Sequence, residues 1–551
     1  MKKLVIFAAA AVTLSAIAAT SSPKKDIAQN LDVFNALVKE LQTYYVDSID
    51  IEKSVTTAIN AMLNDIDPYT EYIPFQDQED FLSVTSGEYG GIGSYITERD
   101  GWVYFSEPQP GSPAMEAGIK PGDKIVMIDN DSTRGWESAR VSKTLKGQAG
   151  TKVKVTVHRP YVEDSVLTFE LTRAKISQPS VPMSGIVGDG IGYIELTSFT
   201  ERSPEEVKDA LLALKEADPN LKGIVFDLRS NGGGLLESAV KIAGYFLPRG
   251  TEVLKTRGKG HLNERTYKTT ERPIDTQIPL VILIDGGTAS ASEIVTGALQ
   301  DMDRAAVIGT RSFGKGLVQS SRELPEDAML KVTIAKYYIP SGRLIQAIDY
   351  SHRNPDGSVS RIPDSLTNVF YTAGGREVRD GGGITPDINV EYPDINRLTF
   401  SIVRDQWIFD YATKFAATHP SIAPAAEFVV TDSIWNDFKS TIDPTRFKYE
   451  KAWEEMFSAI RDVVKQEGYM NDSTDAEFTR LENMLRHDLN ADLDLNRRHI
   501  EPYLGAEIVK RYYNRPGERR YLLRTDAFLD TAATLLNDPA RYKAILAPVK
   551  R

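Results

Sequence analysis

Residues 280–294 have the sequence LVILIDGGTASASEI, in which an apolar run leads into two glycines and then into small hydroxyl residues. The run is too short to span a membrane and is typical of a buried strand. The apolar residues that follow recur with the spacing of one helix face: Ile294, Val295, Ala298 and Leu299. We therefore predict a strand, a sharp turn at the carboxyl end of a sheet, and a helix that begins at or near Ser290.

Ser290 has two interpretations on this local pattern. A nucleophilic serine would be well placed in such a turn, beside backbone N–H groups and the positive end of a helix. Ser290 and Glu293 also have the spacing of a capping box, in which the two side chains satisfy the first N–H groups of a helix. The rest of the chain has to decide between a nucleophile and a helix cap.

Length and composition are those of an ordinary globular protein. The chain has 551 residues, of which 41% are apolar and 26% charged. A chain of this length suggests about three or four domains. The formal net charge is −12, and no long basic run offsets it. We therefore expect neither nucleic acid nor an anionic membrane surface as a partner.

The N-terminus indicates export. Residues 1–18 contain two lysines, an apolar stretch and an Ala-x-Ala end, the pattern of a secretory signal peptide. A membrane anchor is the second interpretation, although the stretch is short and contains Thr13 and Ser15. No other segment is apolar enough to span a bilayer. The chain has no cysteine, which excludes disulfides and suits the periplasm or another compartment across the inner membrane.

Helical patterns occupy both ends of the chain. Residues 19–84 form an expected N-terminal helical segment, in which Ile27–Leu41 is amphipathic. That stretch would cover either its own core or a second copy of the chain, in a homodimer through the terminal helices. Residues 401–551 form an expected C-terminal helical domain. Its large side chains are expected to be buried: Trp435, Phe438, Trp453, Met456 and Phe457.

Residues 85–175 form an expected strand-rich domain that begins with clustered glycines at positions 90, 91 and 93. Such glycines let consecutive N–H groups turn toward a carboxylate, and a neighbouring strand edge can receive an extended peptide. A hairpin loop with positive φ is the plainer explanation of the glycines alone. A dinucleotide-binding loop is excluded, because Ile96 occupies the position of its last glycine.

With its further motifs, this segment resembles a PDZ domain of the bacterial envelope-protease type. The motifs are Gly90-Gly91-Ile92-Gly93, Ser112-Pro113-Ala114, Ala117-Gly118 and Lys120-Pro121-Gly122-Asp123. The resemblance implies that the loop at Gly91, Ile92 and Gly93 binds the terminal carboxylate of a peptide.

Residues 176–400 alternate strand-like and helix-like runs, which predicts a sheet covered by helices. Phe313-Gly314-Lys315-Gly316 lies within them, just after an expected strand. Its glycine spacing is close to that of a phosphate-binding loop, but Gly316 replaces the serine or threonine that would hold magnesium. A desolvated Lys315 could instead act as a general base, and Gln319 could orient its amine. A surface lysine in a glycine turn is the plain alternative.

A glycine run at residues 232–234 follows a strand-like run that ends near Asp227, and a helical pattern comes after it. Bare N–H groups at such a junction can stabilise an oxyanion. Arg229 and Asn231 are expected to fix the turn rather than to react.

Together these stretches resemble the C-terminal processing peptidases, also called tail-specific proteases. The motifs are Asp-Leu-Arg-x-Asn-x-Gly-Gly at 227–234, Ala-Ser-Ala-Ser-Glu-Ile at 289–294 and Phe-Gly-Lys-Gly-x-Val-Gln at 313–319. The resemblance implies a multidomain fold of α/β and α+β type. It consists of a crotonase-like serine peptidase core at 176–400, a PDZ module at 85–175, and helical N- and C-terminal segments.

Carried over by motif, the resemblance assigns Ser290 as the nucleophile, Lys315 as the base and Gln319 as the residue that orients the lysine. The N–H groups of Ala291 and of one glycine of 232–234, expected to be Gly234, would bind the oxyanion. No metal and no organic cofactor is implied.

Three further positions bear on this assignment. Thr288 replaces a serine that many members have, which is a mild change. Lys146 replaces an arginine that in some members couples the PDZ domain to the active site, so this coupling is open here. A possible calcium loop at residues 492–503 lacks the required glycine and glutamate.

The resulting hypothesis is an exported serine endopeptidase that selects protein or peptide substrates by a free, apolar C-terminal tail. The alternative is a catalytically inactive PDZ scaffold or chaperone, against which the intact Ser290, Lys315 and Gln319 set argues. A non-peptidase hydrolase is a third possibility, and the peptide-binding module argues against it.

Overall fold

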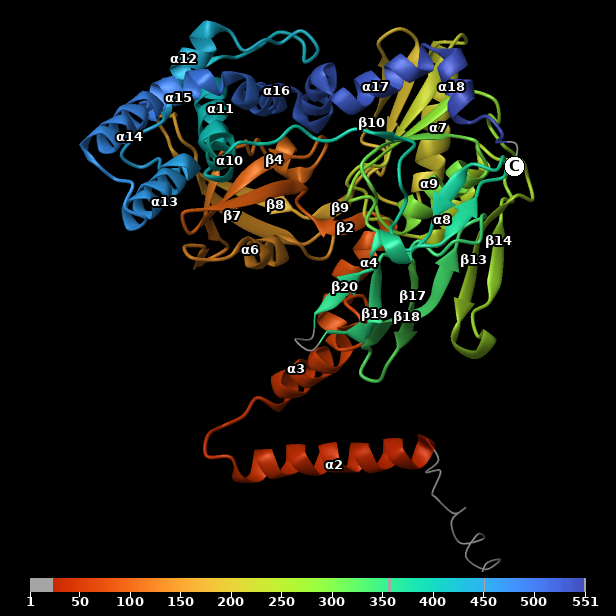
Figure 1. The fold of residues 1–551 in the computed structure, drawn as a ribbon. Coiled ribbons are helices and arrows are strands. Elements are labelled where there is room, and N and C mark those ends of the chain that lie inside the picture. The colour runs from red at the N-terminus through yellow and green to blue at the C-terminus, as the bar shows by residue number, and fades with distance from the viewer. Residues whose placement is uncertain (1–22, 355–357, 450, 550–551) are drawn as a thin grey trace, which may run out of the picture. The chain divides into compact units, whose positions relative to one another are not determined.

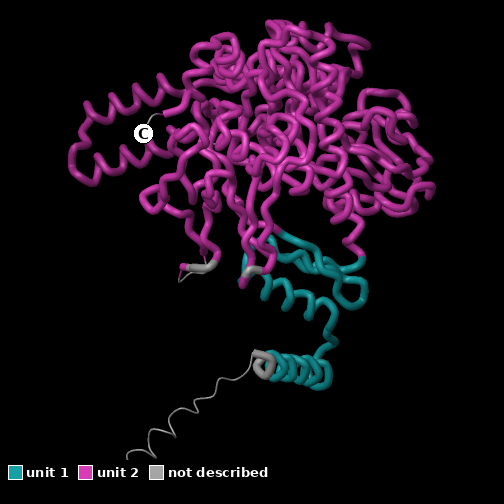
Figure 2. Tube along the Cα trace, turned by 90° about the vertical axis from the view of Figure 1, so that its right-hand side faces the viewer, with its two compact units in different colours: residues 1–75, 319–332 teal, residues 76–318, 333–551 magenta. Residues whose placement is uncertain are grey.

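The computed structural model describes residues 23–354, 358–449 and 451–549. The signal peptide predicted at residues 1–18 lies outside them. The chain divides into two compact units, residues 1–75 with 319–332 and residues 76–318 with 333–551 (Figure 2). None of the helices formed by the described residues combines the length and the apolar character that a bilayer crossing requires.

The first unit contains the helices α2 (Pro23–Tyr44) and α3 (Ile51–Asn64) and the short strand β1 (Glu71–Ile73). Strand β1 pairs antiparallel with residues 329–331. The predicted amphipathic stretch is helical, since it forms most of α2. Its apolar side chains are 40–65% exposed: Ile27, Leu31, Val33, Phe34, Leu37 and Leu41. The helix therefore leaves this apolar face largely open.

In the second unit, the predicted PDZ segment forms an antiparallel sheet with strand order β3-β4-β5-β7-β8, and β6 pairs with β5. The elements are β3 (Ser94–Arg99), β4 (Trp102–Pro108), α5 (Pro113–Glu116), β5 (Lys124–Ile128), β6 (Asp131–Ser132), α6 (Ser138–Leu145), β7 (Lys152–His158) and β8 (Val166–Thr172). Alternate residues of β7 are buried, as expected when one face of a sheet packs on a core: Val153, Val155 and Val157. Strand β3 ends the order, so one of its edges is unpaired within this sheet.

Short elements flank the PDZ sheet on both sides. Helix α4 (Gln78–Ser86) leads into β2 (Glu88–Gly91), and β2 pairs antiparallel with β9 (Ala174–Ser177) after the sheet. The two ends of the PDZ segment are therefore joined to each other where they meet the rest of the unit.

A six-stranded sheet forms the centre of the peptidase region, with order β10-β11-β12-β15-β16-β23. The strands are β10 (Met183–Val187), β11 (Ile191–Glu195), β12 (Gly223–Asp227), β15 (Leu280–Ile284), β16 (Ala306–Gly309) and β23 (Ile388–Asn389). All pairs are parallel except β10 with β11. Every residue of β11, β12, β15 and β16 is buried. Burial on both faces explains why the sequence shows continuous apolar runs.

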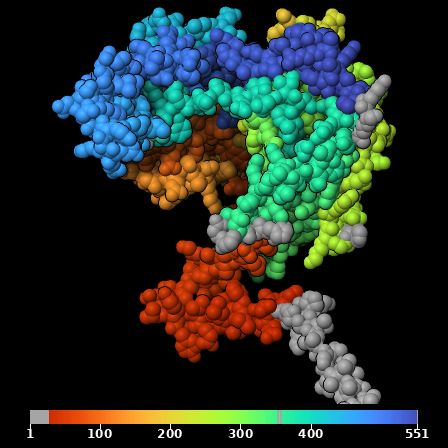
Figure 3. All heavy atoms as spheres, in the orientation of Figure 1, coloured from red at the N-terminus to blue at the C-terminus, as the bar shows by residue number. Residues whose placement is uncertain are grey.

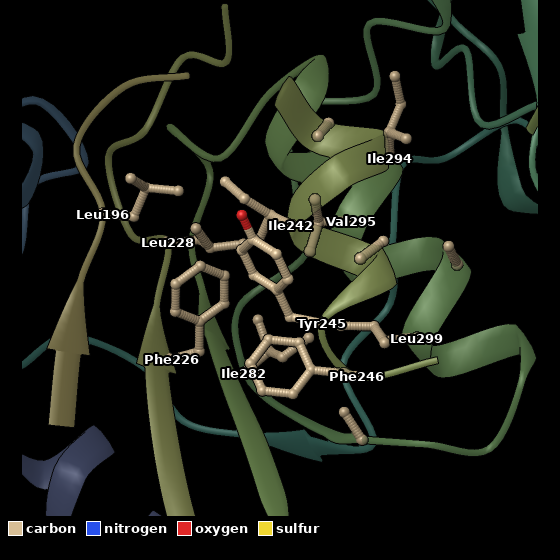
Figure 4. Close-up of a cluster of buried hydrophobic side chains, with 14 of the residues drawn as sticks. Leu196, Phe226, Leu228, Ile242, Tyr245, Phe246, Ile282, Ile294, Val295 and Leu299 are labelled. Atoms are coloured by element: carbon tan, nitrogen blue, oxygen red, sulfur yellow. The ribbon is translucent and has the colours of Figure 1, made fainter. Parts of the chain in front are cut away.

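Three helices cover one face of this sheet: α7 (Ser203–Ala217), α8 (Leu236–Gly244) and α9 (Ala291–Asp301). Figure 4 shows part of the core between them, where Phe226 and Ile282 of the sheet lie beside Tyr245 and Phe246. The rings of Phe226 and Phe246 have centroids 6.3 Å apart. The strand, turn and helix predicted at 280–294 are confirmed as β15 and α9.

The opposite face of the sheet is covered by the end of the chain. Helices α17 (Ala527–Leu536) and α18 (Pro539–Ile545) lie against it (Figure 1). Their buried residues pack on the strand residues that alternate with those of the first face, among them Val225, Val281 and Leu283. The last helices are therefore part of the core of the sheet.

The other strands form further sheets. Strands β13 (Glu252–Gly258) and β14 (Arg265–Lys268) pair with each other, and β13 also pairs with residues 335–338 of β18 (Met329–Tyr338). Strand β17 (Leu317–Glu323) precedes β18. Two antiparallel pairs follow, β19 (Ile348–Arg353) with β20 (Val359–Arg361), and β21 (Val369–Tyr371) with β22 (Glu377–Arg379).

The predicted C-terminal helices are α10 (Arg397–Arg404), α11 (Trp407–Thr418), α12 (Asp432–Thr441), α13 (Ala452–Gln466), α14 (Asp472–Leu485), α15 (Leu489–Leu495) and α16 (Arg497–Leu522). Trp435 and Phe438 are buried in their core, as predicted. The prediction for Met456 is wrong, because its side chain is 69% exposed. Helix α13 has several apolar positions, and the sequence does not show which of them face the partner helix.

These helices contact the PDZ sheet through polar side chains. Arg99 of β3 pairs with Asp410 at 2.5 Å, and Gln406 Nε2 donates to Thr97 Oγ1 at 2.9 Å. In Figure 3 the teal and blue atoms of the helices lie against the orange atoms of the sheet.

Candidate active site

Ser290 lies in the turn between β15 and α9. Its backbone has φ 57° and ψ −116°. A residue with a Cβ adopts such a conformation at a cost of order 1–3 kcal/mol, and only where the surrounding structure enforces it. Ser290 is half-buried, whereas every residue of α9 after it is buried. The fold therefore holds one partly accessible serine in a strained turn at the carboxyl end of a parallel sheet.

The carboxylate of Glu293 joins this turn to the loop that carries Lys315. Its Oε2 accepts hydrogen bonds from the N–H of Ser290 at 2.9 Å and from the N–H of Lys315 at 3.0 Å. Its Oε1 accepts from the N–H of Gly314 and from the hydroxyl of Ser312, both at 2.6 Å. The two backbone nitrogens of Ser290 and Lys315 thus share one oxygen atom.

Burial raises the pKa of the Glu293 carboxyl, while the four hydrogen bonds that it accepts oppose this shift. The carboxylate engages the backbone of Ser290 and not its Oγ. A helix cap and a reactive hydroxyl can therefore occupy the same turn, so the two interpretations of the sequence are compatible.

The glycine run at 232–234 lies against Ser290. Gly233 has φ 101°, and a Cβ there would lie 2.7 Å from the Cβ of Ser290 and 2.9 Å from the backbone nitrogen of Ala291. Atoms cannot approach so closely without displacement of the turn. The close approach requires glycine at this position.

Asn231 fixes the glycine run to the serine turn. Its carbonyl oxygen accepts hydrogen bonds from the N–H of Ala289 at 3.0 Å and from the hydroxyl of Ser292 at 2.9 Å. Its side chain donates to the carbonyl oxygen of Leu196 at 2.7 Å and accepts from the N–H of Gly233 at 2.9 Å. Asn231 thus has the positioning role that the sequence suggested.

The N–H of Gly233 is engaged by Asn231, which removes it from the candidate oxyanion donors. Among the described residues, the N–H groups of Ala291, Gly232 and Gly234 have no hydrogen-bond partner. The choice of a glycine donor therefore narrows to Gly232 or Gly234.

Lys315 is half-buried between two glycines that need positive φ, Gly314 at 83° and Gly316 at 67°. A Cβ on either glycine would lie 2.4 or 2.6 Å from the side chains of Ala347 and Gln346. The Gly-Lys-Gly pattern thus reflects a loop packed tightly against neighbouring backbone. Gln319 lies in β17 and belongs to the first unit, whereas Ser290 and Lys315 belong to the second.

The predicted carboxylate loop connects β2 to the edge strand β3. Gly91 ends β2 and pairs with Ala174. The carbonyl oxygens of Ile92 and Gly93 each accept a backbone hydrogen bond at 2.9 Å, whereas their N–H groups have no partner in the part of the chain that the structure describes. Two unengaged N–H groups at the start of an edge strand suit the end of an extended peptide.

Lys146, which follows α6, pairs with Asp80 of α4 at 2.6 Å. Its Nζ also lies 5.4 Å from the centre of the Tyr89 ring in β2. The lysine thus connects the end of α6 to the segment that leads into the PDZ sheet.

Sequence reasoning missed two groups near the site. Ser312 also accepts a hydrogen bond from the N–H of Ile384 at 2.7 Å, so it fixes the Lys315 loop to a distant segment. Asp285 accepts from the N–H of Ser230 at 2.8 Å and of Gly287 at 2.9 Å. The one feature of the sequence that could have indicated a role for Asp285 is its position directly after a buried strand.

Comparison with known proteins places the chain in a class that fits this geometry. The model of peptidase family S41 matches residues 190–359, a PDZ domain model matches residues 104–159, and the model of the C-terminal helical domain of probable PDZ-proteases matches residues 398–536. The chain belongs to the family of carboxy-terminal processing proteases, which are serine peptidases with a Ser–Lys pair. The predicted family, fold class and enzyme class are confirmed.

Individual relatives agree with this class. A carboxy-terminal-processing protease of Bartonella bacilliformis is 34% identical over 377 residues, which are 68% of this chain and 85% of the relative. The carboxy-terminal processing protease CtpA of Bacillus subtilis is 32% identical over 57% of this chain and 66% of its own length. The solved photosystem II D1 C-terminal processing protease is 26% identical over 65% of this chain and 92% of its own, with a TM-score of 0.35.

Proposed function

We propose that Ser290 is the nucleophile and Lys315 the general base of this peptidase, with the N–H groups of Ala291 and Gly234 as the oxyanion donors. The observation that carries the proposal is the Glu293 carboxylate, which binds the N–H of Ser290 and of Lys315 through one oxygen atom. Two loops far apart in the sequence are thereby held at a fixed spacing, as proton transfer between their side chains requires.

The proposed reaction is acyl transfer followed by hydrolysis. Ser290 Oγ forms a bond to the carbonyl carbon of the scissile peptide while the unprotonated Lys315 Nζ takes the hydroxyl proton. The oxyanion is stabilised by the N–H groups of Ala291 and Gly234. The C–N bond then breaks and Lys315 returns the proton to the leaving amine. Water then attacks the acyl carbon with Lys315 again as base, the ester C–O bond breaks, and Lys315 returns the proton to Ser290 Oγ. Gln319 orients the lysine amine throughout.

Substrates would be proteins or peptides with a free, apolar C-terminal tail. The PDZ domain implies peptide binding, and the loop at Gly91, Ile92 and Gly93 would hold the terminal carboxylate. The tail would add to the free edge of β3 beside α6. Ile96 of β3 is only partly buried and packs against the apolar core of the domain, which supports a preference for apolar tails.

We further propose that the protein is exported, with residues 1–18 as a signal peptide and the periplasm or an equivalent compartment as its location. The proposed domains remain residues 19–84, 85–175, 176–400 and 401–551. A homodimer through the terminal helices is supported by the exposed apolar side chains of α2. No metal or organic cofactor enters the proposed reaction.

Cleavage of a tailed substrate tests the assignment of the site. An unfolded protein with a free apolar C-terminus is incubated with wild type, Ser290→Ala and Lys315→Ala, and with Ser473→Ala as a control at an exposed serine of α14. We expect cleavage by wild type and the control, and a loss of at least about 10³-fold in the two site variants. Equal cleavage by Ser290→Ala would contradict the proposal.

A substrate with an amidated C-terminus tests tail recognition separately. Amidation removes the carboxylate that the PDZ loop would bind, so we expect a higher KM for the amidated tailed substrate than for the free one. A short peptide without a tail should be cleaved at the same rate with a free or an amidated C-terminus. Identical KM values for the free and amidated tails would contradict carboxylate recognition. If the protein is instead an inactive scaffold, wild type and both active-site variants should bind the tailed substrate equally well, and none of them should cleave it.

A further inference from the structure

The segment at the C-terminal end of the chain approaches the glycine run of the candidate site from the far side of the sheet. Asp526 caps α17 by accepting hydrogen bonds from the N–H of Phe528 at 2.9 Å and of Leu529 at 3.1 Å. The same carboxylate accepts from both terminal nitrogens of Arg229, at 3.1 and 2.7 Å. Arg229 begins the turn that leads into Gly232–Gly234. One side chain of the last helices is thus tied to the turn.

The Arg229 guanidinium is held on every side. Asp227, at the end of β12, accepts from its Nε at 3.0 Å and from its Nη2 at 2.6 Å, and the guanidinium carbon lies 4.8 Å from the centre of the Phe528 ring. The side chains of Arg229 and Asp526 are only 12% and 15% exposed. A paired, mostly buried guanidinium has few alternative positions, so it fixes its own backbone.

A second connection from α17 reaches the same turn. The ring of Phe528 packs against Tyr392 with centroids 4.7 Å apart, and the Tyr392 hydroxyl donates to Asp285 at 3.0 Å. Asp285 in turn accepts from the N–H of Ser230, the residue after Arg229. Two consecutive residues of the turn are therefore fixed by groups that α17 contacts.

We propose that Asp526 is a positioning residue for peptide hydrolysis. By holding Arg229 it fixes the backbone that runs through Asn231 to the oxyanion donor at Gly234. Loss of this hold lets the donor N–H drift from the place where the oxyanion forms. The inference rests on the proposed function, since it concerns the same donor. Asp526, at the start of α17, thus contributes to catalysis although it lies far from Ser290 in the sequence.

The chain offers a matched control for this residue. Asp538 caps α18 by accepting from the N–H of Arg541 at 3.0 Å and lies in the same C-terminal segment. Serine is also a good helix cap, but it is too short to span to Arg229. Asp526→Ser therefore keeps a cap and removes the contact with Arg229, whereas Asp538→Ser makes the same change at a cap that does not contact Arg229.

The experiment measures kcat and KM on a tailed peptide for the full chain, after titration of active sites to completion with an irreversible serine-reactive fluorophosphonate. The inhibition constant of a peptide boronate is measured separately. We expect Asp526→Ser to lower kcat per active site about tenfold and to weaken the boronate in parallel, because both depend on the oxyanion donors. KM and binding of an uncleavable tail to the PDZ domain should stay within about twofold. Asp538→Ser should match wild type in kcat per active site.

Four outcomes would overturn the inference. Wild-type kcat in Asp526→Ser, or an equal loss in Asp538→Ser, shows that the contact with Arg229 does not position the donor. If Asp526→Ser does not fold, Asp526→Asn keeps the capping oxygen but turns an NH2 group toward Arg229 Nη2 in place of the acceptor Oδ2. The contact with Arg229 is thereby broken at that nitrogen, and an unchanged kcat in this variant has the same meaning. If Ser290→Ala cuts as well as wild type, the proposed function fails and the inference fails with it. If Ser290→Ala is inactive and Asp526→Ser is not impaired, the inference alone fails.

Discussion

Replacement of Glu293 by glutamine changes one atom of the candidate site and leaves the side-chain volume almost unchanged. The glutamate is fully buried and accepts four hydrogen bonds, two on each oxygen. A glutamine keeps one oxygen and presents an NH2 group in place of the other. The NH2 group then faces two hydrogen-bond donors.

The loss of stability depends on which hydrogen-bond donors the NH2 group of the glutamine faces. On the Oε2 side it would face the N–H groups of Ser290 and Lys315, and both would lose their partner. On the Oε1 side the Ser312 hydroxyl can rotate to accept, so only the N–H of Gly314 is left without a partner. A buried donor without a partner costs about 1–3 kcal/mol, and the remaining bonds lose their charge assistance. We expect a loss of about 2–4 kcal/mol in the free energy of unfolding.

Activity should fall more than stability alone explains. A glutamine accepts these hydrogen bonds less well than the Glu293 carboxylate, so the spacing between the Ser290 turn and the Lys315 loop is no longer fixed. A shift of about 1 Å can cost about 100-fold in rate. We expect kcat per folded molecule to fall about 10- to 100-fold while KM changes little. Urea unfolding gives the stability, and steady-state kinetics on a tailed peptide give kcat and KM.

Glu237→Gln is the matched control, because Glu237 lies in the first turn of α8 and is exposed. This variant should stay within about 0.5 kcal/mol of wild type and keep its kcat. If Glu293→Gln unfolds at the same urea concentration as the control and cuts at the wild-type rate, the reasoning about the shared carboxylate is wrong.

Three further predictions follow from single contacts. Gly233→Ala should reduce kcat about 100-fold or more, because the added Cβ would lie 2.7 Å from the Cβ of Ser290. A Cβ at Gly232 would have no atom within 4 Å, so Gly232→Ala should retain most activity. Equal kinetics of the two variants would contradict this. Arg343→Ala should lower the free energy of unfolding by about 3–5 kcal/mol, because it leaves the buried carboxylate of Asp301 without its 2.9 Å partner; a chemical denaturation curve like that of wild type would refute it. Burial raises the pKa of Glu293, so its carboxyl group binds a proton more tightly in the folded state than in the unfolded state. The free energy of unfolding should therefore fall as pH rises from the ordinary carboxyl pKa to the raised one. Glu293→Gln should lack that part of the pH dependence, and identical stability profiles of the two proteins would disprove it.

The local patterns of the sequence were sufficient for the elements that bear the site. The strand, turn and helix around Ser290 and the strand-rich PDZ segment followed from apolar periodicity and glycine placement, since each depends on neighbouring residues. The same patterns predicted that Asn231 fixes its turn. They failed for Met456, because helical periodicity shows that a helix has an apolar face but not which residues of that face its partner covers.

The class of protein follows from the sequence alone, through motifs whose residue types and order specify the chemistry. Three contacts become visible only in the folded chain: the N–H of Gly233 is engaged, Glu293 binds the Ser290 turn and the Lys315 loop together, and Asp526 holds Arg229. The contacts of Glu293 and Asp526 join segments that meet only when the sheet and its helices have assembled. Asp526 and Arg229 are 297 positions apart. Hydrogen bonds over such separations leave no periodic pattern in the chain, because their geometry is fixed by the packing of the whole core and not by the residues beside them.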